Sequence, residues 1–230
     1  SRGCDQAMQR LGTALTRNWT VQDFRRALEG PLPGLQAQRE MAPHPRPTRP
    51  WPPGHRPRQG GVLLLLYRQG DGWWFPLTLR TEQVAYHQSQ VCLPGGAWDV
   101  ADATLQHTAL RETEEELGVP AASLEVLGRL TPLYIPPSDF CIHPFVAAAA
   151  GRPTFQPDPR EVAEVIEAPV GVLLDPKARQ AEYRLLRGVR ARIPFFQVEG
   201  HQVWGATAMV LAEFAVCLSR LTPGGIPTEK

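Results

Sequence analysis

The pattern of hydrophobic positions predicts several strands, and the clearest is GVLLLLY at residues 61–67. Its unbroken apolar run after a Gly-Gly pair is typical of a strand that is buried on both faces of a sheet. The turn signal Asp71-Gly72 follows, and WWFPLTL at 73–79 has the composition of a hairpin partner. Because Pro76 lacks a backbone N–H, it predicts that this second strand is an edge strand or contains a bulge.

The rest of the chain alternates strand and helix patterns. Helices are predicted at 102–117 and 204–221, with one or two short helices within 5–29, and further strands at 124–134, 140–150, 182–186 and 191–198. This order lacks a strict strand–helix–strand rhythm. It therefore favours an α/β fold with a mixed sheet covered by helices over an all-parallel sheet.

A proline-rich segment at 43–58, PHPRPTRPWPPGHRPR, divides the chain. Its seven prolines exclude a regular helix or sheet. The segment is either a connector into the first core strand or a proline-rich contact for a partner. We therefore expect an N-terminal helical extension at 1–42, a Pro/Arg-rich connector at 43–58, the main domain at 59–222 and a C-terminal tail at 223–230.

Composition limits the classes of partner. The formal net charge is +1, which does not favour nucleic acid or a membrane surface as a partner. The chain shows no apolar signal core and no run approaching the length of a membrane span, so we expect a cytoplasmic protein. The four cysteines, Cys4, Cys92, Cys141 and Cys217, lack metal-ligand spacing and are expected to be reduced and mostly buried.

The stretch TALRETEEELGVP at 108–120 carries the clearest chemical signal. At about 100° per residue, Glu112, Glu115 and Glu116 share one helix face, where like charges repel. No Lys or Arg follows four residues further along to relieve this repulsion. A solvated acidic face is one interpretation, but carboxylate clusters also bind hard divalent cations such as Mg²⁺. We therefore predict that these three glutamates bind metal.

The ends of this helix are also marked in the sequence. Asp102 or Thr104 is suited to cap the N-terminus, and Gly118 followed by Pro120 ends the helix. Leu110 and Leu117 point away from the acidic face, where they can pack into the core. The carboxylates should therefore be held on a fixed support.

Residues 96–119 resemble the Nudix box, G-x5-E-x7-R-E-U-x-E-E-x-G-U, where U is a bulky aliphatic residue. Six positions match in register: Arg111, Glu112, Glu115, Glu116, Gly118 and Val119. Two features depart from the pattern. Asp102 replaces the first Glu and is separated from Arg111 by eight residues instead of seven, and Thr113 replaces the aliphatic residue.

The upstream stretch PLTLRTEQVAYHQSQVCLPGG at 76–96 is similar to a signature of one Nudix subgroup, the coenzyme A pyrophosphatases. It keeps Leu77, Thr78, Arg80 and the Pro94-Gly95-Gly96 turn at the right spacing. It departs from the signature at four positions, Thr81, Ala85, Ser89 and Leu93. The whole resemblance covers about residues 60–221, and Ala85 stands where the subgroup has a second arginine.

The resemblance implies a Nudix-type α/β/α sandwich with a mixed sheet. It also implies a hydrolase that uses Mg²⁺ or Mn²⁺ to cleave CoA or acyl-CoA into phosphopantetheine and adenosine 3′,5′-bisphosphate. Glu112, Glu115 and Glu116 would hold the metal, and Arg111 would orient a neighbouring carboxylate. Glu115 of the box or Glu161 would act as general base. Substrate contacts would come from Arg80, Gly95 and Gly96.

Two alternatives remain open at this point. The same chemistry can act on another nucleoside diphosphate derivative, such as a dinucleotide, a nucleotide sugar or a nucleoside triphosphate. A non-catalytic Nudix module that binds a nucleotide or a protein is the second alternative, although such a module has no physical need for the acidic face. A small-molecule nucleoside diphosphate is the expected partner, and a homodimer is one possible assembly.

Overall fold

The computed structural model describes residues 13–45, 54–81 and 90–222. Its main sheet has the strand order β3-β2-β1-β7-β5, with β4 paired to β1, β6 to β7 and β8 to β2. These strands are β1 Arg58–Gln69, β2 Gly72–Arg80, β3 Val91–Cys92, β4 Gly95–Ala97, β5 Leu124–Arg129, β6 Leu133–Ile135, β7 Phe140–Ala149 and β8 Val162–Pro169. β1 runs parallel to β7 and antiparallel to β2, so the sheet is mixed as predicted.

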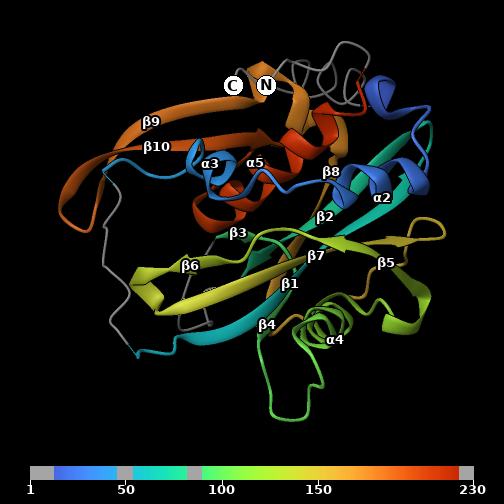
Figure 1. The fold of residues 1–230 in the computed structure, drawn as a ribbon, viewed down its shortest axis with the longest axis horizontal. Coiled ribbons are helices and arrows are strands. Elements are labelled where there is room, and N and C mark those ends of the chain that lie inside the picture. The colour runs from blue at the N-terminus through green and yellow to red at the C-terminus, as the bar shows by residue number, and fades with distance from the viewer. Residues whose placement is uncertain (1–12, 46–53, 82–89, 223–230) are drawn as a thin grey trace.

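A second sheet, of order β11-β10-β9, stands beside α5 (Figure 1). Its strands are β9 Arg179–Leu186, β10 Val189–Val198 and β11 His201–Trp204. The main helices are α2 Val21–Glu29, α3 Gly34–Arg39, α4 Leu105–Leu117 and α5 Gly205–Ser219. The predicted strands and long helices are therefore present, with bounds that differ by a few residues, except that the strand predicted at 124–134 is divided into β5 and β6. α3 lies within the predicted helical extension at 1–42, although no separate helix was predicted at its position.

β1 divides the hydrophobic core into two layers. Its alternate residues Leu64 and Leu66 belong to the larger cluster, which includes the buried face of α5. Leu63, Leu65 and Tyr67 point the other way and pack with buried residues of α4. Figure 1 shows α4 on one side of the main sheet and α2, α3 and α5 on the other. The predicted α/β/α sandwich is confirmed.

The prediction that β2 is an edge strand is wrong, and the alternative of a bulge is not met at Pro76 itself. β2 pairs with β8 along one side, and with β1 and then β3 along the other. The ladder with β1 ends at Trp74 and the ladder with β3 begins at Thr78, so Pro76 lies in the gap and its missing N–H interrupts no ladder on that side. The irregularity of β2 falls at Leu79 and Arg80 instead.

The described part of the N-terminal extension packs into the same core as the rest of the chain. Phe24, Ala27 and Met41 are buried there. Glu213 of α5 is fully buried and accepts hydrogen bonds from Gly34 N at 3.0 Å and Gln38 Nε2 at 2.9 Å. These contacts fix α3 against α5. Three predicted segments lie outside the described residues, wholly or in part: residues 1–12 of the extension, 46–53 of the connector and the tail at 223–230.

Three cysteines in the described part of the chain, Cys92, Cys141 and Cys217, are free thiols, as predicted, while Cys4 lies outside it. Burial raises the pKa of Cys92 and of Cys217 to about 11, so both thiols stay protonated at neutral pH. No helix within the described ranges is long and apolar enough to cross a membrane.

Candidate active site

Helix α4 presents the acidic face on a fixed support. It begins after Thr104, whose side chain accepts a hydrogen bond from His107 N, so Thr104 rather than Asp102 is the cap. It ends at Gly118, whose φ of 69° is left-handed and is easily adopted by glycine. Leu117 is fully buried on the side away from the carboxylates, and Leu110 packs against the same cluster. The helix therefore cannot rotate without losing core contacts.

Gly95 and Gly96, the Gly-Gly turn of the sequence signature, are the first two residues of β4 and lie directly over this acidic face. Gly95 N donates a hydrogen bond to Glu116 Oε2 at 3.1 Å. A Cβ atom on Gly96 would stand 2.5 Å from the carboxyl carbon of Glu112, so a larger residue cannot occupy this position unless the turn or Glu112 shifts. The predicted substrate-contact glycines and two of the predicted metal ligands are thus neighbours.

Arg111 connects the loop before α4 with two glutamates of the acidic face. Its Nη1 lies 2.9 Å from a carboxylate oxygen of Glu112 and 3.2 Å from one of Glu115. Its Nη2 also donates to the carbonyl of Ala97 at 3.3 Å. The resemblance implied that Arg111 would orient a neighbouring carboxylate, and Arg111 contacts both Glu112 and Glu115, which lies one helical turn further along. Part of the repulsion is therefore relieved within the chain.

Asp102 anchors the other end of the Arg111 side chain. Its two carboxylate oxygens accept hydrogen bonds from Arg111 Nε and Nη2, each at 2.9 Å. The hydroxyl of Thr108 and the backbone N–H of Asp99 donate to the same carboxylate. The Arg111 hydrogen bonds, together with these two donors, hold the pKa of the Asp102 carboxyl well below its usual range. From the sequence, Asp102 was predicted only as a helix cap or as a departure from the box.

Glu116 is a buried carboxylate opposite Arg80. Its side chain is 4% exposed, and burial raises its pKa to about 8 against the lowering effects of Arg80 and the Gly95 N–H. Arg80 Nη1 lies 4.0 Å from Glu116, and Nη2 lies 4.0 Å from Glu161. Arg80 Nε is buried without a hydrogen-bond partner among the described residues. Arg80 therefore stands between two acids and keeps unused hydrogen-bonding capacity.

The donor set has the chemistry that a divalent cation requires. Burial raises the pKa of Glu112, and the negative charges of Glu115 and Glu161 raise it further. The charges of Glu112 and Glu161 likewise raise the pKa of Glu116. In the described part of the chain, no group of three His, Cys, Asp or Glu side chains is arranged to hold an ion as it stands. The carboxylates fit a cation by type and charge, with Arg111 and Arg80 occupying some of their oxygens.

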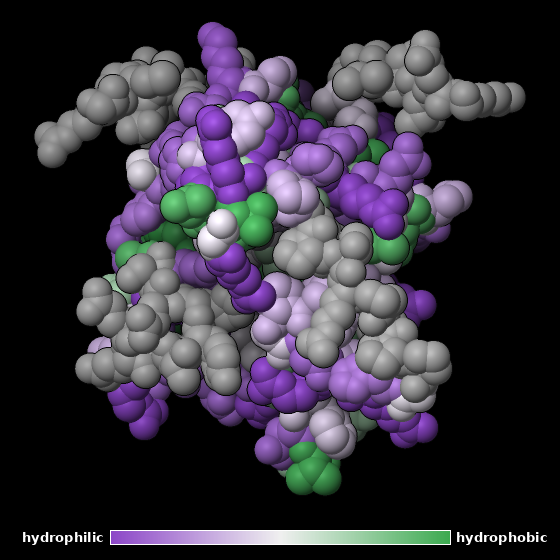
Figure 2. Space-filling view, turned by 90° about the vertical axis from the view of Figure 1, so that its left-hand side faces the viewer, coloured by the Kyte–Doolittle hydropathy of each residue, from purple (hydrophilic) through white to green (hydrophobic). Residues whose placement is uncertain are grey.

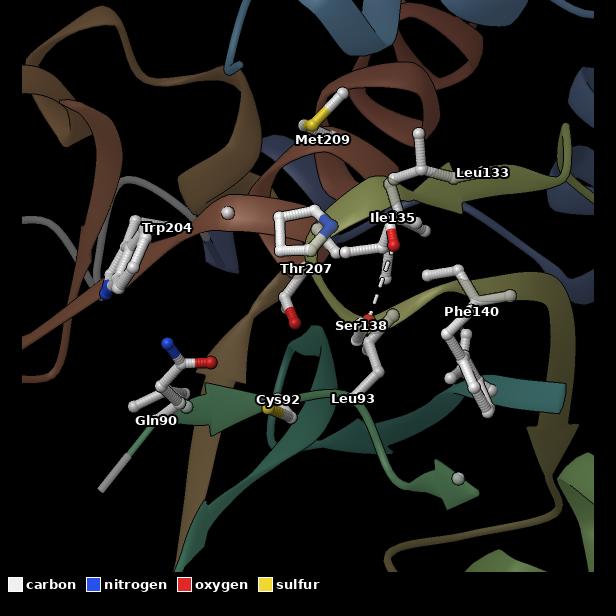
Figure 3. Close-up of a pocket in the computed structure, with 18 of the residues that line it drawn as sticks. Gln90, Cys92, Leu93, Leu133, Ile135, Ser138, Phe140, Trp204, Thr207 and Met209 are labelled. Atoms are coloured by element: carbon white, nitrogen blue, oxygen red, sulfur yellow. Dashed lines mark hydrogen bonds between the residues drawn. The ribbon is translucent and has the colours of Figure 1, made fainter. Parts of the chain in front are cut away.

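A cavity of about 540 Å³ adjoins the Gly-Gly turn. Figure 3 shows Gln90, Cys92 and Leu93 along one wall, Leu133, Ile135 and Phe140 along another, and Trp204, Thr207 and Met209 around the start of α5. Gly95, Gly96 and Arg80 line the same cavity. The wall is otherwise mainly apolar, so the cavity suits an apolar or flat group attached to a polar group near the turn.

The predicted substrate contacts are brought together here, and some wall residues were missed. Arg80 lies at the end of β2, and residues within 133–140 line the same cavity. Leu93, one departure from the signature, is buried in the wall, whereas Ala85 and Ser89 lie outside the described residues. Trp204 also lines the wall, and it was not among the predicted site residues because it stands far from the box along the chain.

The comparison with family models matches a NUDIX domain at residues 57–189. This match covers more than half of the chain, so the chain belongs to the Nudix family. Nudix hydrolases act on phosphorus anhydrides, and the chain is therefore an enzyme of this class.

Two relatives found by sequence comparison agree with this assignment. The chain is 34% identical over 171 residues to a protein named "Uncharacterized Nudix hydrolase NudL" of Pectobacterium atrosepticum, covering 73% of this chain and 86% of that one. It is 38% identical over 168 residues to the human "Mitochondrial coenzyme A diphosphatase NUDT8", covering 71% of this chain and 65% of that one. A solved MutT/nudix family protein from Enterococcus faecalis is 16% identical with a TM-score of 0.48, covering 76% of this chain and 66% of that one.

Proposed function

We propose that the protein hydrolyses the diphosphate of CoA or acyl-CoA, giving phosphopantetheine or its acyl form and adenosine 3′,5′-bisphosphate. The observation that carries this proposal is the mainly apolar cavity that adjoins the Gly-Gly turn and Arg80, beside the acidic face of α4. A diphosphate at the turn would lie next to the carboxylates, while one arm of the substrate fills the cavity. The name of the human relative, a coenzyme A diphosphatase, supports the same substrate.

Glu112, Glu115 and Glu116 would hold Mg²⁺ or Mn²⁺. A bound divalent ion would neutralise phosphate oxygens and lower the pKa of an attacking water. Arg111, fixed by Asp102, sets the rotamers of Glu112 and Glu115 so that their oxygens face the site. Arg80 supplies a cation for the diphosphate through nitrogens that only weakly contact Glu116 and Glu161.

The general base takes a proton from the water while the water oxygen forms a new bond to phosphorus and the P–O bond to the leaving phosphate breaks. Glu115 and Glu161 are the two candidates. Both oxygens of Glu115 accept hydrogen bonds from Arg111, whereas the cation nearest to Glu161 stands at 4.0 Å. Glu161 is also 44% exposed and can exchange its proton with solvent. The geometry therefore favours Glu161 as the base.

A second candidate function is the same reaction on another nucleoside diphosphate derivative. The departures from the CoA signature favour it, and one of them, Leu93, lies in the cavity wall. A panel of CoA, NADH, ADP-ribose and diadenosine polyphosphates, each incubated with Mg²⁺ and then with Mn²⁺, separates the two. Highest kcat/KM on CoA supports the proposal. No cleavage of CoA with turnover of another compound would move the assignment to that substrate.

A further inference from the structure

The cavity wall has a strong excess of positive charge. Three arginines, Arg58, Arg80 and Arg187, line it, and no Asp or Glu is found among the described residues of the wall. The rest of that wall is largely apolar. A cavity of this kind favours a ligand that has an apolar or flat body and more than one anionic group.

Arg80 already faces the position proposed for the diphosphate, but the other two arginines do not contact the acidic face. The Cζ of Arg58 lies 5.2 Å from the centre of the Phe140 ring, and its Nη2 donates to the carbonyl of Ser138 at 3.3 Å. Neither Arg58 nor Arg187 forms an ion pair within the described part of the chain. Both side chains therefore carry charge that the protein itself does not neutralise there.

The positions of these two arginines place them at the solvent-exposed edge of the cavity. Arg58 begins β1, and Arg187 lies in the turn between β9 and β10, at a left-handed φ of 53°. Both residues are exposed although they line the cavity. Figure 2 faces this side of the molecule, where hydrophilic side chains surround exposed apolar ones; Leu185 and Val189 on either side of the turn are among the exposed apolar residues.

CoA carries one anionic group besides its diphosphate, the 3′-phosphate on the ribose of adenosine. The pantetheine arm is uncharged, so it would leave Arg58 and Arg187 without a counter-charge. We propose that the cavity takes the adenosine arm and that Arg58 and Arg187 bind its 3′-phosphate, which makes the enzyme selective for nucleotides phosphorylated on the ribose. The inference rests on the proposed function. These arginines would replace the subgroup's second arginine, which is absent at Ala85.

The test compares CoA with dephospho-CoA, which differs only by the missing 3′-phosphate. Charge-assisted hydrogen bonds from two arginines to a phosphate predict a kcat/KM on CoA that is ~10- to 100-fold above that on dephospho-CoA. In the double variant Arg58→Gln/Arg187→Gln, the ratio of kcat/KM on CoA to that on dephospho-CoA should fall to near one. Arg187→Lys should keep part of it, because lysine retains the charge but not the paired N–H groups.

The matched control is Arg190→Gln, on the same hairpin. The Cζ of Arg190 lies 4.8 Å from the centre of the Tyr183 ring, and Arg190 does not line the cavity. This variant should therefore keep the wild-type ratio of kcat/KM on CoA to that on dephospho-CoA. Thermal unfolding of each variant verifies that the fold is retained. If the wild type cleaves both compounds equally, or if the double variant keeps the ratio, the inference is wrong while the proposed function stands. If the wild type cleaves neither compound, the proposed function itself fails.

Discussion

Arg111 and Asp102 form a paired contact in which two guanidinium nitrogens each donate to a separate carboxylate oxygen at 2.9 Å. The contact joins α4 to the loop that precedes it. Because the other nitrogen of Arg111 reaches Glu112 and Glu115, the buried Asp102 indirectly fixes two of the proposed metal ligands. Asp102 is thus a positioning residue for a site that its side chain does not enter.

Replacing Asp102 by Asn tests this relationship through stability. The pKa of Asp102 is lower in the folded protein than in the unfolded chain, so ionised Asp102 stabilises the fold above the unfolded-state pKa of about 3.9. This stabilisation is lost as the pH falls through the folded-state pKa. Asp102→Asn should therefore be less stable than the wild type by about 1–3 kcal/mol at pH 7. This difference in the free energy of unfolding should become smaller below about pH 4. Urea unfolding at both pH values measures it.

Asp71→Asn is the control for this experiment. Asp71 pairs with Arg17 on the surface, where its side chain is 70% exposed, so its loss should change stability by less than about 1 kcal/mol. A gap for Asp102→Asn that stays constant from pH 7 to pH 3 would contradict the assigned role of its charge.

Glu116→Gln should make the metal-free protein more stable at alkaline pH. Burial raises the pKa of Glu116 to about 8 in the folded protein, against about 4.3 in the unfolded chain. Below about pH 4.3, Glu116 is protonated in both states and does not affect stability. Between about pH 4.3 and about pH 8 only the unfolded chain ionises, so the fold is increasingly destabilised. With EDTA at pH 8.5, the Tm of Glu116→Gln should exceed that of the wild type by at least ~3 °C, equivalent to about 1 kcal/mol. At pH 5 the difference should be much smaller. An equal Tm at pH 8.5 would argue against a costly buried charge.

Added metal should stabilise the wild type more than variants of the acidic face. At a free Mg²⁺ or Mn²⁺ concentration of 100 times Kd, binding to the folded state alone contributes about 2.7 kcal/mol, a rise in Tm of roughly 5–10 °C. Glu112→Gln should lose most of this rise. Glu114→Gln should keep it, because Glu114 is exposed and its carboxylate accepts from Ala121 N instead. If Glu112→Gln showed the full metal-induced rise in Tm, Glu112 would not be a metal ligand.

Glu213→Ala should destabilise the protein by about 2–4 kcal/mol. The carboxylate of Glu213 also accepts from Thr131 N and Thr131 Oγ1, at 3.0 and 2.6 Å, so its loss leaves several buried donors unpaired. Urea unfolding gives the value, with Glu29→Ala at the exposed end of α2 as comparison. A loss below about 0.5 kcal/mol would mean that α3 is not held in the core by this residue.

The sequence predicted those parts of the fold and site that depend on local pattern. The apolar run of β1 required burial on both faces, and the spacing of Glu112, Glu115 and Glu116 placed them on one helix face whatever the tertiary structure. The Gly-Gly turn was predictable because it belongs to the same motif as the helix.

What the sequence could not predict depends on contacts between distant segments. Pro76 reads as an edge signal from its own chemistry, and only the arrangement of β1, β3 and β8 shows that it falls in a gap. Arg58 and Arg187 are far apart along the chain and meet one cavity only through the fold. Glu213 likewise gave no local sign that it would be buried against α3.

The most direct test of the central claim is product release from CoA by the wild type and Glu116→Gln, followed by chromatography with Mn²⁺ and again with EDTA. The wild type with metal should release adenosine 3′,5′-bisphosphate and phosphopantetheine in equal amounts. Release should be absent with EDTA, and the rate for Glu116→Gln should be on the order of 10³-fold lower. A folded Glu116→Gln protein that cleaves CoA at the wild-type rate would contradict the claim that the acidic face of α4 performs the reaction.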